Sequence, residues 1–115
     1  MNLQKRKPIR SKAITQAANG EACTVCERND GTTVFCHLNE GWAGKGMGQK
    51  ADDIAGFFGC RECHDIYDGR GGLDVIPYSN DVVVRAMYRT WRRLIEKGVI
   101  TIKGKVKPPT DGEEE

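Results

Sequence analysis

Hydrophobic residues recur at helical spacing in the last third of the chain, where they predict its longest helix. Asn80 or Asp81 is expected to cap this helix, and Gly98 is expected to end it. Its apolar side is predicted to contain Val83 or Val84, Met87, Tyr88, Trp91, Leu94 and Ile95. The same criteria predict a short helix over residues 12–18 and another that begins near Arg61 and stops at Gly69.

Shorter apolar runs between these helices predict strands. Residues 32–38 are β-branched and apolar, and the turn signal Asp30-Gly31 precedes them. Residues 52–58 form a second strand or its approach, and residues 99–102 are a candidate for a short edge strand. Residues 39–50 contain four glycines, which predicts a long loop of the kind that is often functional.

Four of the five cysteines form two Cys-x2-Cys pairs. Cys23 and Cys26 are separated from Cys60 and Cys63 by 33 residues. Thiolates at this spacing are typical of a tetrahedral zinc site, and the gap leaves room for a hairpin and a loop before the second pair starts a helix. We therefore predict an α+β fold: a small zinc-stapled treble-clef domain with flanking helices. Disulfide or redox roles for these cysteines are the alternative.

The composition agrees with a metal-stapled domain. A chain of 115 residues that is 38% hydrophobic builds only a modest core, so a staple is expected. The sequence contains no apolar signal-peptide segment and no hydrophobic run near membrane-spanning length. We therefore expect a protein of the reducing cytosol that has no membrane partner.

The charge is distributed unevenly along the chain. The formal net charge is +2, but residues 111–115 carry four negative charges, so residues 1–110 carry +6. We expect a disordered basic arm over residues 1–9, a folded domain over 10–103 and a disordered acidic tail over 104–115. Basic residues gather near the arm (Lys5, Arg6, Lys7, Arg10 and Lys12) and on the long helix (Arg85, Arg89, Arg92 and Arg93). Both groups suit nucleic acid, and both are equally compatible with an ordinary solvated surface.

A second constellation consists of His37, His64 and Asp68. On a helix that begins near Arg61, His64 and Asp68 lie four residues apart on one face, where both can reach one cation. That cation is distinct from the ion bound by the cysteines. Hydrolysis of a phosphodiester requires a base that deprotonates water and a divalent cation that neutralises charge on the phosphate and the leaving oxygen. We expect the three side chains to share one water-accessible site.

The order of these motifs resembles the HNH (ββα-metal) endonucleases. The shared order is Cys-x2-Cys, a strand with His37, a glycine-rich loop, and Cys-x2-Cys followed by His64 and Asp68. Within that superfamily, three stretches are similar to the small prophage nuclease family typified by YbcO: residues 9–11, 20–24 and 60–65. The similarity covers roughly residues 9–72 and weakens through the last helix.

The resemblance implies a role for each matched residue. His37 is the general base, while His64 and Asp68 hold a catalytic Mg²⁺, Mn²⁺ or Zn²⁺ ion beside the structural zinc. Asp53 falls near the family's central asparagine position, where it either holds the imidazole of the base in its useful tautomer or joins the metal shell. Arg70, which follows the helix, is a candidate phosphate ligand.

The resemblance also implies DNA as substrate, phage or prophage recombination proteins as possible partners, and the bacterial cytoplasm as location. Low sequence specificity is expected, because the basic residues suit phosphates and no element for reading bases stands out. In the glycine-rich loop, Lys45 and Lys50 are candidate DNA contacts, and Trp42 is either a base-stacking residue or a surface anchor.

Cys36 departs from the family pattern, which commonly has an acidic or histidine ligand before the catalytic histidine. Neighbours on a strand point to opposite faces, so Cys36 is predicted to pack in the core; if it binds the cation instead, its thiolate favours zinc. Two other functions remain open. One is a non-catalytic zinc module that binds nucleic acid or a protein. The other is a redox switch at Cys36, which requires a thiol of low pKa.

Overall fold

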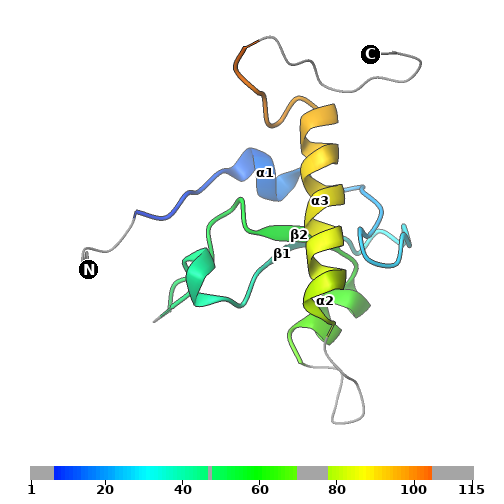
Figure 1. The fold of residues 1–115 in the computed structure, drawn as a ribbon. Helices are drawn as coiled ribbons and strands as arrows, with labels where there is room; N and C mark the ends of the chain where they lie inside the picture. Colours follow the sequence, from blue (N-terminus) through cyan, green and yellow to red (C-terminus); the bar gives the residue numbers. More distant parts are fainter. Residues whose placement is uncertain (1–6, 47, 70–77, 105–115) are drawn as a thin grey trace.

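An antiparallel pair of short strands, covered by helices, forms the centre of the fold. The computed structural model describes residues 7–46, 48–69 and 78–104. Its elements in chain order are α1 (Lys12–Gln16), β1 (Val34–His37), the 3-10 turn η1 (Gly41–Ala43), β2 (Gly56–Gly59), α2 (Arg61–Tyr67) and α3 (Asn80–Glu96) (Figure 1). The predicted α+β class is confirmed. β1 and β2 lie between the two cysteine pairs, and α2 begins directly after Cys60 and contains Cys63, which is the treble-clef arrangement.

Side chains alternate between the two faces along each strand, and both faces of the sheet pack against a core cluster. In the register of the two strands, Phe35 lies opposite Phe58 and Cys36 lies opposite Phe57. Phe35 and Phe58 pack in one core cluster, which includes Ile14 of α1; this face is called the α1 side. Cys36 and Phe57 pack in a second cluster, and the ring of Tyr67 from α2 meets Phe57 edge to face at 5.3 Å; this face is called the α2 side.

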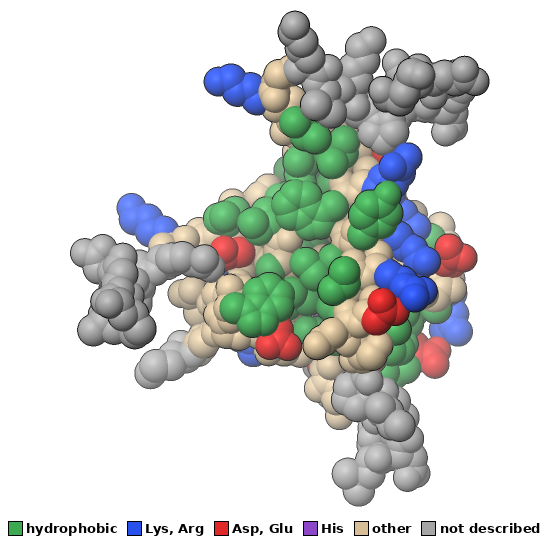
Figure 2. Space-filling model, in the orientation of Figure 1, with side chains coloured by type: hydrophobic (Ala, Val, Ile, Leu, Met, Phe, Trp, Pro, Cys, Tyr) green, Lys and Arg blue, Asp and Glu red, His purple; other side chains and the backbone are tan. Residues whose placement is uncertain are grey.

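Helix α3 lies against the strands and contributes to both clusters through Ala86 and Leu94. Between them, the buried Thr90 hydroxyl accepts a hydrogen bond from Phe58 N at 3.0 Å. Hydrophobic periodicity does not identify this contact, because a threonine does not count toward an apolar face. Hydrophobic side chains gather beside α3 on the face shown in Figure 2, and Lys and Arg side chains follow its other flank.

Two predictions about α3 are wrong in detail. Its cap is Ser79, whose hydroxyl accepts from Val82 N at 3.4 Å, and not Asn80 or Asp81. Tyr88 is 63% exposed, although it was expected on the apolar side. Of the alternatives Val83 and Val84, Val83 packs against the α2-side cluster, and Val84 is 62% exposed. Alanine and threonine fill the closest positions on α3, which turns these larger residues away from the core.

The predicted edge strand over residues 99–102 is also wrong. Gly98 adopts a φ of 74°, and the N–H groups of Val99 and Ile100 both donate to the carbonyl of Leu94, at 2.9 and 3.2 Å. The chain therefore turns back on the end of α3, and Val99 and Ile100 pack against the α1-side cluster.

Most of the predicted arm and tail lies outside the described residues, which include only 7–9 and 104 of those segments. Ile9 N donates to Asp52 Oδ1 at 3.2 Å, and Ile9 O accepts from Asp53 N at 2.8 Å. These bonds hold the chain before α1 against the approach to β2. In the described part of the chain, no helix has the length and apolar character needed to span a membrane.

Candidate functional site

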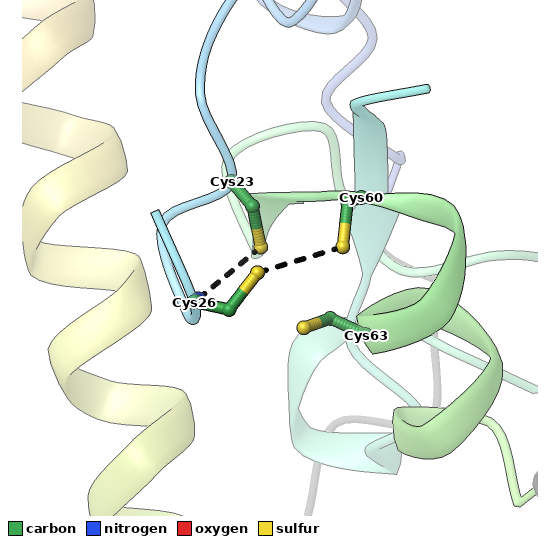
Figure 3. Close-up of side chains that lie close together, drawn as sticks. All are labelled: Cys23, Cys26, Cys60 and Cys63. Carbon is green, nitrogen blue, oxygen red and sulfur yellow. Dashed lines mark hydrogen bonds between the residues drawn. The ribbon is translucent and has the colours of Figure 1, made fainter. Parts of the chain in front are cut away.

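The four paired cysteines meet at one point, as the sequence predicts (Figure 3). The ligand atoms of Cys23, Cys26, Cys60 and Cys63 all lie within 4.8 Å of one another, and Cys26 Sγ is 3.7 Å from Cys60 Sγ. Four sulfurs at about 2.3 Å from a tetrahedral Zn²⁺ are about 3.8 Å apart, so this spacing fits a structural zinc ion. Of the five cysteines, only Cys36 stands outside the cluster.

Local backbone geometry presents the sulfurs to the metal position. Val25 N and Cys26 N lie 3.4 and 3.5 Å from Cys23 Sγ. Burial raises the pKa of the Cys23 thiol, but these and other backbone N–H groups outweigh burial and lower that pKa to about 7. Burial raises the pKa of Cys63, which accepts a hydrogen bond from Tyr78 Oη at 3.2 Å. A bound cation stabilises the thiolate form of all four.

Two arginines of α3 hold the first cysteine pair in place. Arg89 Nη1 donates to Thr24 O at 2.9 Å, and Arg93 Nη1 donates to Ala22 O at 2.6 Å. The other two basic residues of this group pair within the helix, Arg85 with Asp81 and Arg92 with Glu96. This structural role of Arg89 and Arg93 does not follow from the sequence, because no motif links α3 to the first cysteine pair, about 70 residues earlier.

His37 pairs with Asp53. Nε2 of His37 is 2.7 Å from Oδ1 of Asp53, while Oδ2 accepts from Ser11 N at 2.7 Å and Arg10 Nη1 lies 3.6 Å from Oδ1. Burial raises the pKa of Asp53, but the bonds from His37 and Ser11 outweigh it and hold that pKa below its ordinary value. A carboxylate only accepts, so Nε2 of His37 carries the proton and Nδ1 of the neutral ring keeps its lone pair.

His64 and Asp68 pair on α2, one helical turn apart. Nε2 of His64 is 3.1 Å from Oδ2 of Asp68, and the two side chains are 30% and 22% exposed. Two ligands at right angles, each about 2.1 Å from a divalent cation, are about 3.0 Å apart. The two side chains contact each other directly as an ion pair, and the same separation also fits two neighbouring ligands of one cation. Their partial exposure leaves access for water.

Asn39 is a residue of this region that sequence analysis missed. Its side-chain Nδ2 donates to Asp68 Oδ1 at 3.0 Å, and its backbone N donates to Tyr67 Oη at 2.9 Å. These bonds orient the carboxylate of Asp68 toward its partners. The available signal was a polar residue two positions after His37, directly beyond the predicted strand.

The two pairs are held from different sides of the sheet. His37 lies on the α1 side, where its ring meets that of Phe35 at 5.0 Å, whereas α2 packs on the other side. Within the described residues, the four cysteines are the one set of three or more His, Cys, Asp or Glu side chains placed to hold a metal ion, so His37 does not join His64 and Asp68 as a third ligand. Asn39 connects the two regions: it donates to Asp68, and it follows His37 by two residues, a stretch that spans only about 7 Å even when fully extended. The pairs thus flank the end of β1.

The remaining candidate residues are placed as follows. Cys36 is fully buried on the α2 side, and burial, followed by the charge of Asp68, raises the pKa of its thiol to about 12. The prediction that Cys36 packs in the core is confirmed, and the raised pKa is the opposite of what a redox switch needs. Lys45 and Lys50 are exposed in the loop around η1, and Arg70 lies outside the described residues.

The buried Asp53 carboxylate leads to a prediction on stability and pH. The pKa of Asp53 is lowered in the folded state. The ionised carboxylate therefore contributes fully to the free energy of unfolding above the ordinary aspartate pKa, and this contribution disappears as the pH falls through the lowered pKa. We expect Asp53→Asn to destabilise the protein by about 2 kcal/mol at neutral pH, because hydrogen bonds to a charged group are lost. Denaturant unfolding of both proteins between pH 7 and pH 3 measures this difference, which should narrow in acid. A difference that grows in acid would contradict the assignment.

Comparison with known proteins identifies a family and a similar fold. The family described as "Putative nuclease YbcO" matches residues 11–99. A solved structure, described as a putative bacteriophage protein from Escherichia coli str. K-12 substr. MG1655, is similar with a TM-score of 0.55 and 27% identity, covering 73% of this chain and 98% of that one. No curated protein matches the chain significantly. Because the family match spans α1 to the end of α3, the chain belongs to the YbcO family.

Proposed function

We propose that this protein is a metal-dependent endonuclease of the HNH type, which hydrolyses DNA phosphodiester bonds with low sequence specificity. The observation that carries the proposal is the arrangement around the end of β1, where a carboxylate-held imidazole and a cation-spaced His-Asp pair flank the same few residues. Metal-dependent hydrolysis of a phosphodiester uses a base and a charge-neutralising ion, and these two pairs offer side chains for both.

In the proposed reaction, Nδ1 of His37 takes a proton from the attacking water. The Asp53 carboxylate holds Nε2–H and stabilises the imidazolium that forms, as an orienting carboxylate does for other catalytic histidines. His64 and Asp68 would hold a divalent cation, which would supply charge neutralisation at the phosphate and the leaving oxygen. The scissile phosphodiester lies across the end of β1, between the two pairs.

The setting of the reaction is proposed from the surroundings of the site. Lys45 and Lys50 are exposed on the loop that follows β1, where they can bind phosphates of either strand without reading bases. The similar structure is a phage protein by its description, which supports a role in phage or prophage recombination or DNA processing.

Nicking of supercoiled plasmid in the presence of Mg²⁺ or Mn²⁺ tests the proposal. We expect His64→Ala and Asp68→Asn to lower the nicking rate by more than about 100-fold. Losing a residue that only supports a metal ligand typically lowers metal affinity or activity by about 10–100-fold, and losing the ligand itself should cost more. Glu62→Gln is the matched control: Glu62 is also on α2, but its carboxylate pairs with Arg28 at the surface, 2.8 Å away. This variant should nick at the normal rate.

A different result would support another function. If the zinc-loaded protein binds DNA but does not nick it with any divalent cation, the non-catalytic zinc module becomes the better interpretation. In that case, His64→Ala and Glu62→Gln should have equal effects on DNA binding.

A further inference from the structure

A groove of about 490 Å³ opens between η1, the end of α2 and the start of α3. Three aromatic residues line it, Trp42, Tyr67 and Tyr78, together with three polar residues (Asn39, Glu40 and Asn80) and four apolar ones (Leu38, Val83, Val84 and Met87). Its size lies within the range of small-molecule sites, roughly 300–1,000 Å³. The zinc ligands and the residues of the His37–Asp53 and His64–Asp68 pairs are not among the described residues that line the groove.

The side chains around the groove suit an uncharged aromatic ligand better than a phosphate. No Lys or Arg is among the described residues that line it, and the carboxylate of Glu40 repels anions. Trp42 is 70% exposed, so its indole is open for stacking. The amides and the carboxylate can hydrogen bond the edge of a nucleobase, as Asn and Glu do in sequence-reading proteins.

The groove is continuous with the proposed cation site. Asn39 lines the groove and also donates to Asp68, and Tyr67 lines the groove and is the residue before Asp68 in α2. A nucleotide next to a phosphate held at His64 and Asp68 therefore has its base within reach of the groove. In paired DNA that base is stacked in the helix and is not free to enter.

We propose that this groove receives one unstacked nucleobase beside the scissile phosphate, so that the enzyme acts on DNA with an unpaired nucleotide, such as a bulge, a gap or a single-stranded junction. This inference rests on the proposed nuclease function and specifies its substrate class. Stacking on Trp42 supplies most of the preference, and the polar side chains Asn39, Glu40 and Asn80 hold the edge of the base.

Binding of three fluorescent DNA duplexes tests the inference: one fully paired, one with a single-nucleotide bulge, and one with an abasic site in the bulge. The zinc-loaded full chain is titrated by anisotropy without added Mg²⁺ or Mn²⁺, so that the DNA is not cut. We expect the bulged duplex to bind about tenfold more tightly than the other two, because stacking of one base contributes about 1–3 kcal/mol.

Three variants test whether the groove is the source of the tighter binding to the bulged duplex. Trp42→Ala should remove the tenfold preference and leave binding of the paired duplex within about twofold, while Trp42→Phe should keep most of the preference. Tyr88→Ala is the matched control, because Tyr88 is an aromatic residue that is 63% exposed on α3 and does not line the groove. It should keep the full preference.

The outcomes separate this inference from the proposed function. Equal binding of the bulged and abasic duplexes, or loss of the preference in Tyr88→Ala as well, would overturn the inference and leave the groove to another occupant, such as a protein segment. Nicking by the same preparation with Mn²⁺ would then still support the nuclease. A base-dependent preference without any nicking would uphold the base pocket as a binding site and count against hydrolysis.

Discussion

Replacing Cys60 by serine is expected to leave the chain unfolded under conditions in which the native protein is folded. Cys60 is fully buried, precedes α2 directly, and its sulfur lies 3.7 Å from that of Cys26. Structural zinc contributes about 10–16 kcal/mol in zinc-finger peptides, which is comparable to or larger than the whole stability of a small domain, about 5–15 kcal/mol. The sheet has only two strands of four residues, so little remains to hold it together without the ion.

Circular dichroism and the zinc content per chain measure this effect. Cys36→Ala is the matched control, because Cys36 is also fully buried but stands outside the sulfur cluster. It should keep one zinc per chain and lose only about 1 kcal/mol through reduced packing. A strong chelator should unfold the native protein in the same way as Cys60→Ser. A zinc-free native protein that is fully folded would contradict the structural role of the ion.

Replacing His37 by alanine is expected to lower the nicking rate by about 10²–10⁴-fold, the usual contribution of a positioned general base. The zinc content should not change, because His37 stands outside the sulfur cluster. The protein should stay folded but lose about 1–2 kcal/mol of stability, because the buried Asp53 carboxylate loses the hydrogen bond from the imidazole. Asp53→Asn should also lower the nicking rate, because an amide can present its N–H to the ring and favour the wrong tautomer. Single-turnover nicking with Mn²⁺ measures both rates.

Added imidazole provides a second measurement for the same residue. If His37 is the base, free imidazole should restore part of the rate of His37→Ala, whereas it should not rescue Asp68→Asn, which has lost a cation ligand. Nicking by His37→Ala at the native rate, with zinc retained, would remove His37 from the mechanism. Asp68→Asn would still test the cation site separately.

Spacing along the chain was sufficient to predict the parts of the structure that depend on neighbouring residues. The cysteine pairs, the start of α2 and the placement of His64 and Asp68 on one helical face all follow from separations of three or four residues, and the helix confirms that placement. The alternation of side chains on a strand likewise predicted that Cys36 is buried away from His37.

Contacts between distant segments could not be read in this way. Val84 and Tyr88 looked apolar enough for the core, but Ala86 and Thr90 fill the close approach between α3 and β2. Asn39 contacts Asp68, which is 29 positions away in the sequence, and Arg89 contacts Thr24, which is 65 positions away. No local preference encodes such pairs, because each depends on how the whole chain packs around the metal.

The sequence by itself determined the cysteine set that can hold a structural zinc ion, the α+β class and the pairing of His64 with Asp68 on one helical face, since each is a matter of residue type and short-range spacing. Only the tertiary structure decided that Asp53 pairs with His37 and not with the cation ligands, that the two pairs flank the end of β1 from different sides of the sheet, and that an aromatic groove adjoins Asp68. The physical reason is that these relations are set by the packing of α1, α2 and α3 on a two-stranded sheet, and packing geometry depends on long-range contacts that no short stretch of residues specifies.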